Sequence, residues 1–505
     1  MTDSVQRPMN GAEYLESLRD GREVYAYGEL VEDVTTHPAF ELPTRTIARM
    51  YDSLHDPASG MVTVPTDTGN GGYTHPFFKM PTSIEELRHS RDAIAHWARM
   101  SYGWMGRTPD YKASFLGVLK AEPDFYSPYQ ENAARWYRES QEKVLYWNHA
   151  LVNPPIDRNL SIEEGGDVVV HVERETDAGL ILSGAKVVAT GSAMTHMTFL
   201  AHSGAPLKDK RFAIVAAVPM NAPGLKLISR VSYAQTASQS SSPFDHPLSS
   251  RFDENDPILV LDQVLVPWEN VFMYGDLDKT FATMDGFGER AAFHGAIRLA
   301  TKLDFIVCLL MKSLDLTGTK EFRGVQARLG EAVAWRSMIW SLVEAMVSGG
   351  RVGAGGAVNP NLDAVNAYRW FGDKAYTAVR DIVMKDLGSA LIYLPSSSKD
   401  FASPRIRPYL DKYVRGSGGH DAEDRVKTLK LLWDAVGTEF AGRHDLYERN
   451  YMGNHELIRL FVYGSTMGAG TGSQLIELAE QAMSEYDLNG WTLPEYQTGT
   501  QEEHL

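Results

Sequence analysis

The stretch PILVLDQVLVPWENVFMYGD, residues 257–276, separates two regions of the chain that follow different patterns. Its apolar residues stand between turn residues and predict a short strand. From about residue 165 up to this stretch the pattern is that of short strands, and after it the pattern is that of long helices. A β region therefore gives way to a helical region here.

The β region contains several short apolar runs separated by turns. DVVVHVERET (167–176) alternates, AGLILSGAKVVATGSAMTHMTFLAHS (178–203) predicts strand, turn and strand, and RFAIVAAVPM (211–220) predicts a further strand. Short strands with turns at regular spacing are typical of a small barrel or sandwich.

Helical patterns lie on both sides of the β region. Residues 10–150 are predicted to be largely helical, and the two prolines of NPPIDRN (153–159) stop that pattern. Downstream, four segments have the length and spacing of bundle helices and predict an antiparallel four-helix bundle. These segments are residues 295–318, 324–349, 362–388 and 425–451.

The composition argues against several classes of protein. The net charge of −16 is unlike the basic surfaces that bind nucleic acid or anionic membranes. With one cysteine, Cys308, the chain cannot form an intrachain disulfide or a Cys-rich metal site, and no HExxH motif occurs. The N-terminus lacks a secretory signal, and the apolar runs are too short to span a bilayer. We therefore expect a cytoplasmic protein without a metal site.

Motifs for bound nucleotides and for a serine nucleophile are also missing. The sequence has no GxSxG elbow and no P-loop. Two glycine clusters, GGRVGAGG (349–356) and GAGTGS (468–473), neither follow a predicted strand nor open a βαβ unit. The chain is therefore expected to have no nicotinamide-binding domain of its own.

One helix start places charged and aromatic residues together. In YGWMGRTPDY (102–111), Thr108 suits the N-cap and Pro109 the first helical position, so Arg107 precedes the helix and Tyr111 lies in its first turn. An arginine beside the partly positive helix N-terminus favours an oxyanion. His149 is predicted to end an aromatic helix. Taken alone, each of these residues is more often structural than catalytic.

The sequence around residues 257–276 resembles the acyl-CoA dehydrogenase fold. Four separated motifs within that fold resemble the 4-hydroxyphenylacetate 3-monooxygenase family, the oxygenase components of two-component phenol hydroxylases. These motifs are YGWMGRTPDY (102–111), NHALVNPPIDRN (148–159), GAKVVATGSAMTH (184–196) and FAGRHDLYERNYMGNHE (440–456). The text between them is closest to the tyrosine-type branch, which includes hydroxylases of carrier-bound β-tyrosine units in enediyne antibiotic biosynthesis.

The resemblance implies an α+β fold of three domains. They are an N-terminal helical domain (residues 1–152), a small β-barrel (153–277) and a C-terminal four-helix bundle (278–505). By analogy with relatives of this fold, a homotetramer is expected.

The resemblance also implies roles for particular residues. Arg107, Tyr111 and His149 match the catalytic trio that holds the phenol oxygen, and His149 is also expected to contact the flavin. A covering loop at residues 202–211 is expected to contribute substrate contacts from His202 and Ser203. The remaining flavin contacts implied are Pro155, Ile156, Asp157, Arg158, Thr190, Phe440, Gly442, Arg443 and His444.

The activity implied is hydroxylation of a 4-hydroxyphenyl substrate ortho to its phenol. FADH₂ and O₂ would form a flavin C4a-hydroperoxide that must be shielded from water, and a separate NAD(P)H:flavin reductase would supply the FADH₂. Free tyrosine, β-tyrosine, a chlorinated ring and a unit tethered to a peptidyl carrier protein all fit the sequence.

Other activities stay open at this point. The chain fits a 4-hydroxyphenylacetate or chlorophenol hydroxylase. It also fits an acyl-CoA dehydrogenase-type FAD oxidoreductase, for which Glu331 or Glu344 would be the base, and a non-catalytic scaffold that has kept the fold.

Overall fold

The computed structural model describes residues 7–157, 159–202, 206–240, 242–283, 285–451, 453–468 and 471–497. Two of the expected site residues, Arg158 and Ser203, lie outside the described residues. The chain forms two compact units, residues 1–449 and residues 450–505.

Helices dominate the first part of unit 1. Ser83 caps the third of them by accepting a hydrogen bond from the backbone N–H of Glu86, and Leu87, Ile94 and Trp97 form its buried face. The helices are α1 (Gly11–Ser17), α2 (Glu41–Ser53), α3 (Ile84–Met100), α4 (Pro109–Ala121) and α5 (Gln130–Lys143).

Two sheets form the β region. The larger has the strand order β2-β1-β10-β11-β7-β6 and the smaller has the order β12-β9-β8-β5, and a bridge between Val152 and Val187 joins the exits of β5 and β7. The strands of the larger sheet are β1 (Glu23–Ala26), β2 (Glu29–Leu30), β6 (His171–Thr176), β7 (Gly179–Lys186), β10 (Leu225–Ile228) and β11 (Ile258–Pro267). Those of the smaller sheet are β5 (Trp147–Ala150), β8 (Met197–Leu200), β9 (Ile214–Pro219) and β12 (Val271–Tyr274).

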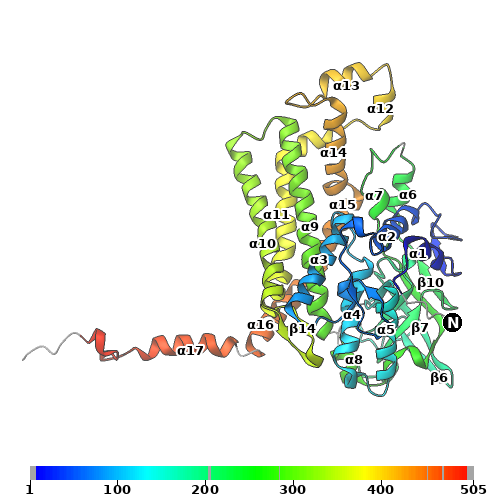
Figure 1. The fold of residues 1–505 in the computed structure, drawn as a ribbon, viewed down its shortest axis with the longest axis vertical. Coiled ribbons are helices and arrows are strands. Elements are labelled where there is room, and N and C mark those ends of the chain that lie inside the picture. The colour runs from blue at the N-terminus through cyan, green and yellow to red at the C-terminus, as the bar shows by residue number, and fades with distance from the viewer. Residues whose placement is uncertain are drawn as a thin grey trace, which may run out of the picture. The chain divides into compact units, whose positions relative to one another are not determined.

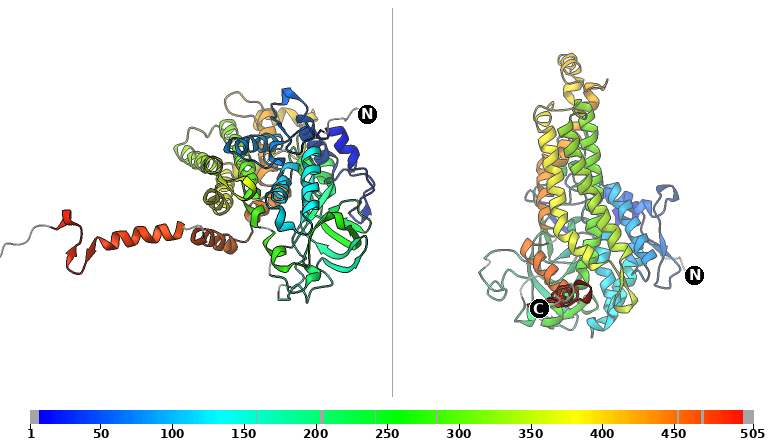
Figure 2. Two further views of the ribbon diagram at one scale, coloured as in Figure 1. Left: turned by 60° about the horizontal axis from the view of Figure 1, so that its bottom comes forward. Right: turned by 90° about the vertical axis from the view of Figure 1, so that its left-hand side faces the viewer.

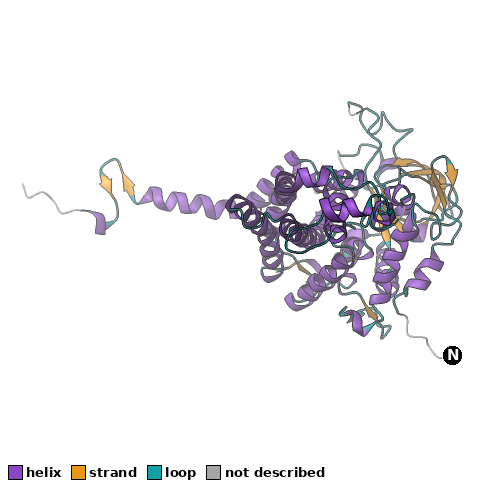
Figure 3. Cartoon of the chain, turned by 90° about the horizontal axis from the view of Figure 1, so that it is seen from above, coloured by secondary structure: helices purple, strands orange, loops and turns teal. Residues whose placement is uncertain are grey.

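The strand predicted from the sequence around residues 257–276 lies within the larger sheet. It is β11, which pairs antiparallel with β7 on one side and with β10 on the other. The segment before residue 150 also contributes strands, because β1 pairs parallel with β10. Figure 3 shows most of the strands of unit 1 gathered on one side of it, away from the long helices.

The prediction that His149 ends a helix is wrong. Helix α5 ends at Lys143, where Val144 adopts a left-handed φ of 52° that a β-branched residue rarely takes. After this break the aromatic residues favour a strand, and β5 pairs parallel with β8 so that His149 lies opposite Phe199. His149 therefore projects from a sheet rather than from a helix.

Long helices form the rest of unit 1. Figures 1 and 2 show α9 (Asp285–Thr317), α10 (Arg323–Ser348) and α11 (Leu362–Ile392) running side by side, and α14 (Ala422–Val436) packs against α9 and α11. The fourth predicted helix is two helices, because the chain breaks after Val436 and resumes as α15 (Glu439–Asn450). Helix α9 also packs against α3 and α4, which places it between the bundle and the N-terminal helices.

Short elements complete the two units. In unit 1 they are β3 (Val64–Pro65), β4 (Tyr73–Thr74), α6 (Tyr233–Ser238), α7 (Ser249–Phe252), α8 (Leu277–Ala282), β13 (Arg351–Val352), β14 (Val358–Asn359), α12 (Lys399–Ala402) and α13 (Arg407–Tyr413). Unit 2 contains α16 (His455–Gly468), α17 (Thr471–Ser484), β15 (Tyr486–Asp487) and β16 (Gly490–Trp491). In the described part of the chain, no helix is both long and apolar enough to cross a membrane.

Candidate active site

The start of α4 has the form that the sequence predicts. Thr108 is extended at the N-cap position and Pro109 occupies the first turn. The backbone N–H groups of Gly106 and Arg107 both donate to the carboxylate of Glu254, at 2.8 Å and 2.6 Å. A buried carboxylate from the β region therefore fixes the chain just before the helix.

The guanidinium of Arg107 lies between two tyrosine rings. Its Cζ is 4.4 Å from the ring centroid of Tyr111, and its Nη1 donates to the hydroxyl of Tyr447 on α15 at 2.6 Å. Gly106 makes this approach possible, because a Cβ there would lie 2.3 Å from the Tyr447 hydroxyl oxygen. The sequence thus brings Arg107 and Tyr111 together and adds a tyrosine from a distant helix.

His149 reaches the same place from strand β5. Its ring centroid is 6.2 Å from that of Tyr111 and 5.7 Å from that of Phe115. Its Nδ1 is in direct contact with the Nζ of Lys112, a residue on α4 that is 1% exposed. The three residues of the expected trio therefore converge, and a lysine lies among them.

Burial and positive charge disfavour a second proton on His149. Burial, Lys112 and Arg107 all lower the pKa of His149 well below its ordinary value. The pKa of Lys112 is also lowered well below its ordinary value, by burial and by the charge of Arg107, while Glu254 opposes that shift. His149 is therefore a neutral imidazole near pH 7.

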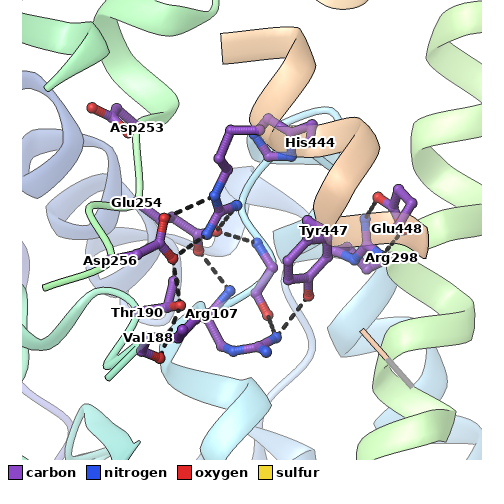
Figure 4. A network of polar contacts seen from close by, with 12 residues as sticks. Arg107, Val188, Thr190, Asp253, Glu254, Asp256, Arg298, His444, Tyr447 and Glu448 are labelled. Carbon is purple, nitrogen blue, oxygen red and sulfur yellow. Dashed lines mark hydrogen bonds and ion pairs between the residues drawn. The ribbon is translucent and has the colours of Figure 1, made fainter. Parts of the chain in front are cut away.

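A second group of polar residues surrounds Thr190 (Figure 4). The Thr190 hydroxyl donates to Oδ1 of Asp256 at 2.6 Å, and Arg443 on α15 binds both oxygens of that carboxylate, at 2.6 Å and 3.0 Å. Arg230 donates to Asp256 as well, at 2.9 Å. Burial alone would raise the pKa of Asp256, but Arg443 and Arg230 outweigh burial and hold it below its ordinary value.

Glu254 connects the two groups. It accepts from the backbone ahead of α4, and its Oε2 is 3.8 Å from Nη1 of Arg443. The chain at Gly191, next to Thr190, also approaches Arg107, because a Cβ at that glycine would lie 3.9 Å from the Arg107 Cβ. The residues expected to hold the phenol and the residues expected to contact the flavin are therefore neighbours.

The segments expected to form the flavin-binding turn and the covering loop leave the sheet at the same end. Because β5 and β8 are parallel neighbours, the segments that follow them, Asn153–Asp157 and His202, emerge together. The buried Nζ of Lys186 joins the two exits by donating to Leu151 O at 3.1 Å, Ala201 O at 3.2 Å and Asn153 Oδ1 at 2.8 Å. Pro155, Ile156 and Asp157 are exposed, whereas His202 is buried.

The C-terminal segment of the expected site is mostly buried. Phe440 and His444 pack against Trp104, with ring centroids 5.6 Å and 4.9 Å from it. Gly442 is exposed, and a Cβ built there would meet nothing within 4 Å. Of this segment, Gly442 and the partly buried Arg443 are therefore the residues open to a ligand.

Sequence reasoning missed four residues of this region. Lys112 stands in a helix whose neighbouring residues are apolar or small, which is an available signal for a buried charge. Tyr447, Glu254 and Asp256 offer no comparable signal, because their importance depends on contacts between segments far apart in the chain. They belong to the motifs DENDP (253–257) and RHDLYE (443–448).

The alternative catalytic carboxylates lie elsewhere. Glu331 and Glu344 are both exposed on α10, and Glu344 forms an ion pair with Arg91 at 2.6 Å. Within the described ranges, no group of three His, Cys, Asp or Glu side chains is placed to hold a metal ion.

Comparisons with known proteins agree with this architecture. Residues 10–273 match the model described as 4-hydroxyphenylacetate 3-hydroxylase N terminal, and residues 279–477 match the model described as 4-hydroxyphenylacetate 3-hydroxylase C terminal. The chain belongs to the 4-hydroxyphenylacetate 3-hydroxylase family. It is therefore a flavin-dependent aromatic monooxygenase, as the sequence predicts.

Two relatives within the family are equally similar to this chain. One is the (3S)-3-amino-3-(3-chloro-4-hydroxyphenyl)propanoyl-[peptidyl-carrier protein SgcC2] monooxygenase of Streptomyces globisporus, 58% identical over 97% of this chain and 94% of the relative. The other is the oxygenase component of a 4-nitrophenol 2-monooxygenase from a Rhodococcus species, also 58% identical with the same coverage.

A solved structure of the family superposes on this one. It is the oxygenase component of a 4-hydroxyphenylacetate 3-monooxygenase in complex with FAD and 4-hydroxyphenylacetate, with a TM-score of 0.87, 28% identity, and coverage of 94% of this chain and 99% of that chain. The predicted α+β fold class is confirmed, because this chain shares the fold of that oxygenase component. Its assignment to the acyl-CoA dehydrogenase type stays a prediction. The division into three domains at residues 152 and 277 stays a prediction.

Proposed function

We propose that this chain is an oxygenase component that uses FADH₂ and O₂ to hydroxylate a 4-hydroxyphenyl substrate ortho to its phenol. The observation that carries the proposal is the convergence of Arg107, Tyr111 and His149 from two separate elements beside the N-terminus of α4. Thr190 and Arg443, which are expected to contact the flavin, lie beside this trio through Glu254 and Gly191.

The residues present fit a flavin. Val152, Ile156 and Val188 are about half exposed or more, although they are apolar, and Val188 has a left-handed φ of 56° that costs strain in a β-branched residue. Such a surface suits a planar ring, and the open backbone at Gly442 suits close approach of a ligand. The residues that would hold FAD are Pro155, Ile156, Asp157, Arg158, Thr190, Gly442 and Arg443.

Arg443 already has two carboxylate partners within the protein. Its Nε and Nη2 bind Asp256, and its Nη1 is 3.8 Å from Glu254. Its Nη1 is buried without a hydrogen bond. A phosphate oxygen would satisfy that nitrogen, so Arg443 serves as one donor to the flavin diphosphate rather than as an unmatched positive charge.

Reduced FAD, when bound, supplies two electrons that allow O₂ to place one oxygen atom on the ring and to leave the other as water. The chain's own residues hold and orient the phenol for this reaction. Arg107 and the partly positive N-terminus of α4 stabilise a phenolate oxygen, and Tyr111 and His149 hold it in place. Phe115, which stacks on Phe287 at 3.6 Å and packs on Phe199 at 4.8 Å between ring centroids, excludes water beside them.

We favour a β-tyrosine-type substrate, chlorinated or not, carried on a peptidyl carrier protein. The Streptomyces globisporus relative acts on such a unit and shares 58% identity over nearly the whole chain. A small free phenol is the second candidate, because the 4-nitrophenol relative is equally similar. Both substrates present the same phenol group to Arg107, Tyr111 and His149, and they differ in the group attached at the para position.

A flavin reductase is the expected functional partner. Relatives are named as oxygenase components, which implies a separate component that supplies reduced flavin. We also propose a homotetramer in the cytoplasm. Support for assembly comes from unit 2, where α16 and α17 expose the apolar side chains of Leu457, Leu460, Leu475, Ile476 and Leu478.

The proposal is tested with single-turnover mixing of FADH₂-loaded protein, oxygen and either free or carrier-bound substrates, with product mass as the readout. Wild-type protein should add one oxygen atom. Arg107→Ala and His149→Ala should consume FADH₂ and release hydrogen peroxide without catechol, while Glu331→Gln on the exposed face of α10 should behave as wild type. Normal hydroxylation by both Arg107→Ala and His149→Ala would show that the assigned phenol site is wrong.

A further inference from the structure

We propose that Lys112 is a positioning residue that fixes the tautomer of His149 and thereby makes this site select the phenolate form of its substrate. Lys112 donates to Nδ1 of His149, so the imidazole proton lies on Nε2 and His149 donates a hydrogen bond to the substrate oxygen. This inference rests on the proposed phenol site.

The Nζ of Lys112 contacts one imidazole nitrogen and two aromatic rings. Its Nζ contacts Nδ1 of His149 and lies 4.2 Å from the ring centroid of Tyr111 and 5.3 Å from that of Phe115. A bound anion favours the protonated form of Lys112, and an ammonium group has three donors and no acceptor, so with substrate bound the contacted nitrogen must accept. A neutral imidazole that accepts at Nδ1 carries its proton on Nε2.

The local charges agree with a bound anion. Arg107 is a cation beside a neutral histidine, and burial together with Arg107 disfavours the charged form of Lys112. Among the residues that the structure describes no carboxylate forms an ion pair with Lys112, so a bound anion is the group that would restore its charge. Glu254 is the nearby acidic group, and it is occupied by the backbone N–H groups of residues 106 and 107. A phenolate oxygen would supply the negative charge that this arrangement lacks.

Groups on the other packed elements do not change that balance. Asp110, on α4, lies 3.2 Å from Nε2 of His294 on α9 and 4.0 Å from Nε2 of His75. Tyr447, on α15, accepts from Arg107 and has a pKa raised to about 12 by burial, so it stays a neutral hydroxyl. His149 itself is held neutral by burial and by its two basic neighbours. A donor at Nε2, rather than a base, is what the site offers to the substrate.

The consequence concerns which protonation state binds. A neutral phenol binds more weakly here, because its oxygen carries no charge and its O–H finds no acceptor at His149 Nε2, whereas a phenolate accepts from Arg107 and from His149 Nε2 as a charged acceptor. The electron-rich phenolate ring is also the form that is more easily attacked at its ortho carbon. Lys112 thus acts on the substrate through His149.

The experiment uses 4-nitrophenol as a probe, because its phenol and phenolate forms differ in visible absorbance. Full-length protein without flavin is titrated with the probe across pH, and the apparent pKa of the bound probe is compared with that of the free probe. Wild-type protein should lower it by about one unit or more, a tenfold or larger preference for the phenolate. Lys112→Met should abolish most of that shift, and Lys112→Arg, which keeps a charged donor, should retain it.

Two controls separate the possible outcomes. Lys120→Met removes an exposed lysine further along α4 and should leave the shift unchanged. Lys112→Met is also measured in a His149→Phe background, where a residue that acts through His149 has no further effect. If Lys112→Met shifts the probe as strongly in that background, Lys112 acts directly on the phenolate and the inference is overturned.

The proposed phenol site fails in a different way. If wild-type protein does not bind the probe, or if Arg107→Ala and His149→Phe leave the ionisation of the bound probe unchanged, the phenol site itself is misplaced. If both of those variants change the ionisation while Lys112→Met, folded by its thermal transition, does not, the phenol site stands and the role of Lys112 is refuted.

Discussion

Two lysine–histidine pairs in this molecule, each with a buried lysine, are built almost alike and differ in one neighbour. Lys112 contacts Nδ1 of His149 and lies 4.2 Å from a tyrosine ring centroid, and Lys302 contacts Nδ1 of His444 at 3.2 Å and lies 4.3 Å from the ring centroid of Trp104. Both lysines are 1% exposed or less. Lys302, however, also forms an ion pair with Glu448 at 2.6 Å.

The extra carboxylate gives the second pair a different role. Glu448 accepts from Arg298 through both oxygens, at 2.6 Å and 2.7 Å (Figure 4). It also accepts from Lys302. One carboxylate inside the protein serves as counterion to both cations there, so the network ties α9 to α15. At Lys112 no described carboxylate plays that part, and a bound anion is what would favour the charged form of that lysine. A buried charge is structural where the fold supplies its counterion and functional where the substrate does.

The largest effect on the free energy of unfolding is expected when the Lys302–His444 pair loses its carboxylate and so resembles the Lys112–His149 pair. Glu448→Gln removes the carboxylate and leaves Arg298 and Lys302 buried without it, which should destabilise the protein by about 3–5 kcal/mol. Urea unfolding measures the loss. Glu344→Gln, which breaks an exposed pair with Arg91, is the control and should cost less than about 1 kcal/mol. Equal losses in the two variants would mean that the buried network is not what stabilises this region.

Acid should produce the same change without a mutation. Burial would raise the pKa of Glu448, but Arg298 and Lys302 outweigh it and lower the value to about 2 from 4.5. A carboxylate whose pKa is lower in the folded than in the unfolded protein stabilises the fold at any pH above the unfolded pKa. About 3 kcal/mol of that stability should therefore be lost as the pH falls from about 4.5 to 2.

The acid effect is checked by urea midpoints measured from pH 6 downward. Glu448→Gln should show a shallower decline than wild type. Glu13→Gln is the matched control, because Glu13 has a pKa lowered to about 2 by Arg7 but lies in solvent, where screening weakens the pair. An unchanged acid slope in Glu448→Gln would argue that Glu448 is not ionised in the folded protein.

The converse change gives the Lys112–His149 pair a carboxylate and should weaken its binding of anions. His149→Glu places an acid beside Lys112, which should pair with it and repel a phenolate, weakening 4-nitrophenolate binding by about 30-fold, or about 2 kcal/mol. His149→Gln separates the loss of the imidazole from the added charge and should bind more tightly than His149→Glu. Tight phenolate binding by His149→Glu would show that the missing carboxylate is not what opens this site to anions.

Much of the fold could be predicted from local patterns. Apolar periodicity predicts α9, α10 and α11 and the strand β11, because each buries a continuous face or both faces. The helix predicted up to His149 is wrong because pairing with β8 overrides the local pattern after Val144. The break between α14 and α15 was equally hidden, since a short interruption does not disturb helical spacing.

The candidate site could be predicted only in part. Arg107 and Tyr111 stand four residues apart across a recognisable helix start, so the sequence alone places them together. Their joining to His149 rested on the family resemblance. Glu254 and Tyr447 could not be found in this way, because their contacts with residues 106 and 107 span 148 and 340 positions of the chain and leave no local pattern.

The smallest effect is expected at the residue next to Glu448. On α15 the consecutive residues Tyr447 and Glu448 serve the two regions, since Tyr447 accepts from Arg107 and Glu448 holds Lys302. Tyr447→Phe removes one hydrogen bond worth about 1 kcal/mol but keeps the ring, whose centroid is 5.1 Å from the Arg107 Cζ. Binding of 4-nitrophenol should weaken about fivefold, with little change in urea stability.

Tyr376→Phe is the matched control for Tyr447→Phe, because the buried Tyr376 hydroxyl has no hydrogen-bond partner among the described residues and its loss should leave probe binding unchanged. A drop in stability for Tyr447→Phe as large as that of Glu448→Gln would mean that Tyr447 belongs to the structural network. Tyr447 and Glu448 would then both belong to the structural network around Lys302. The contrast between Lys112 and Lys302 would rest on Glu448 alone.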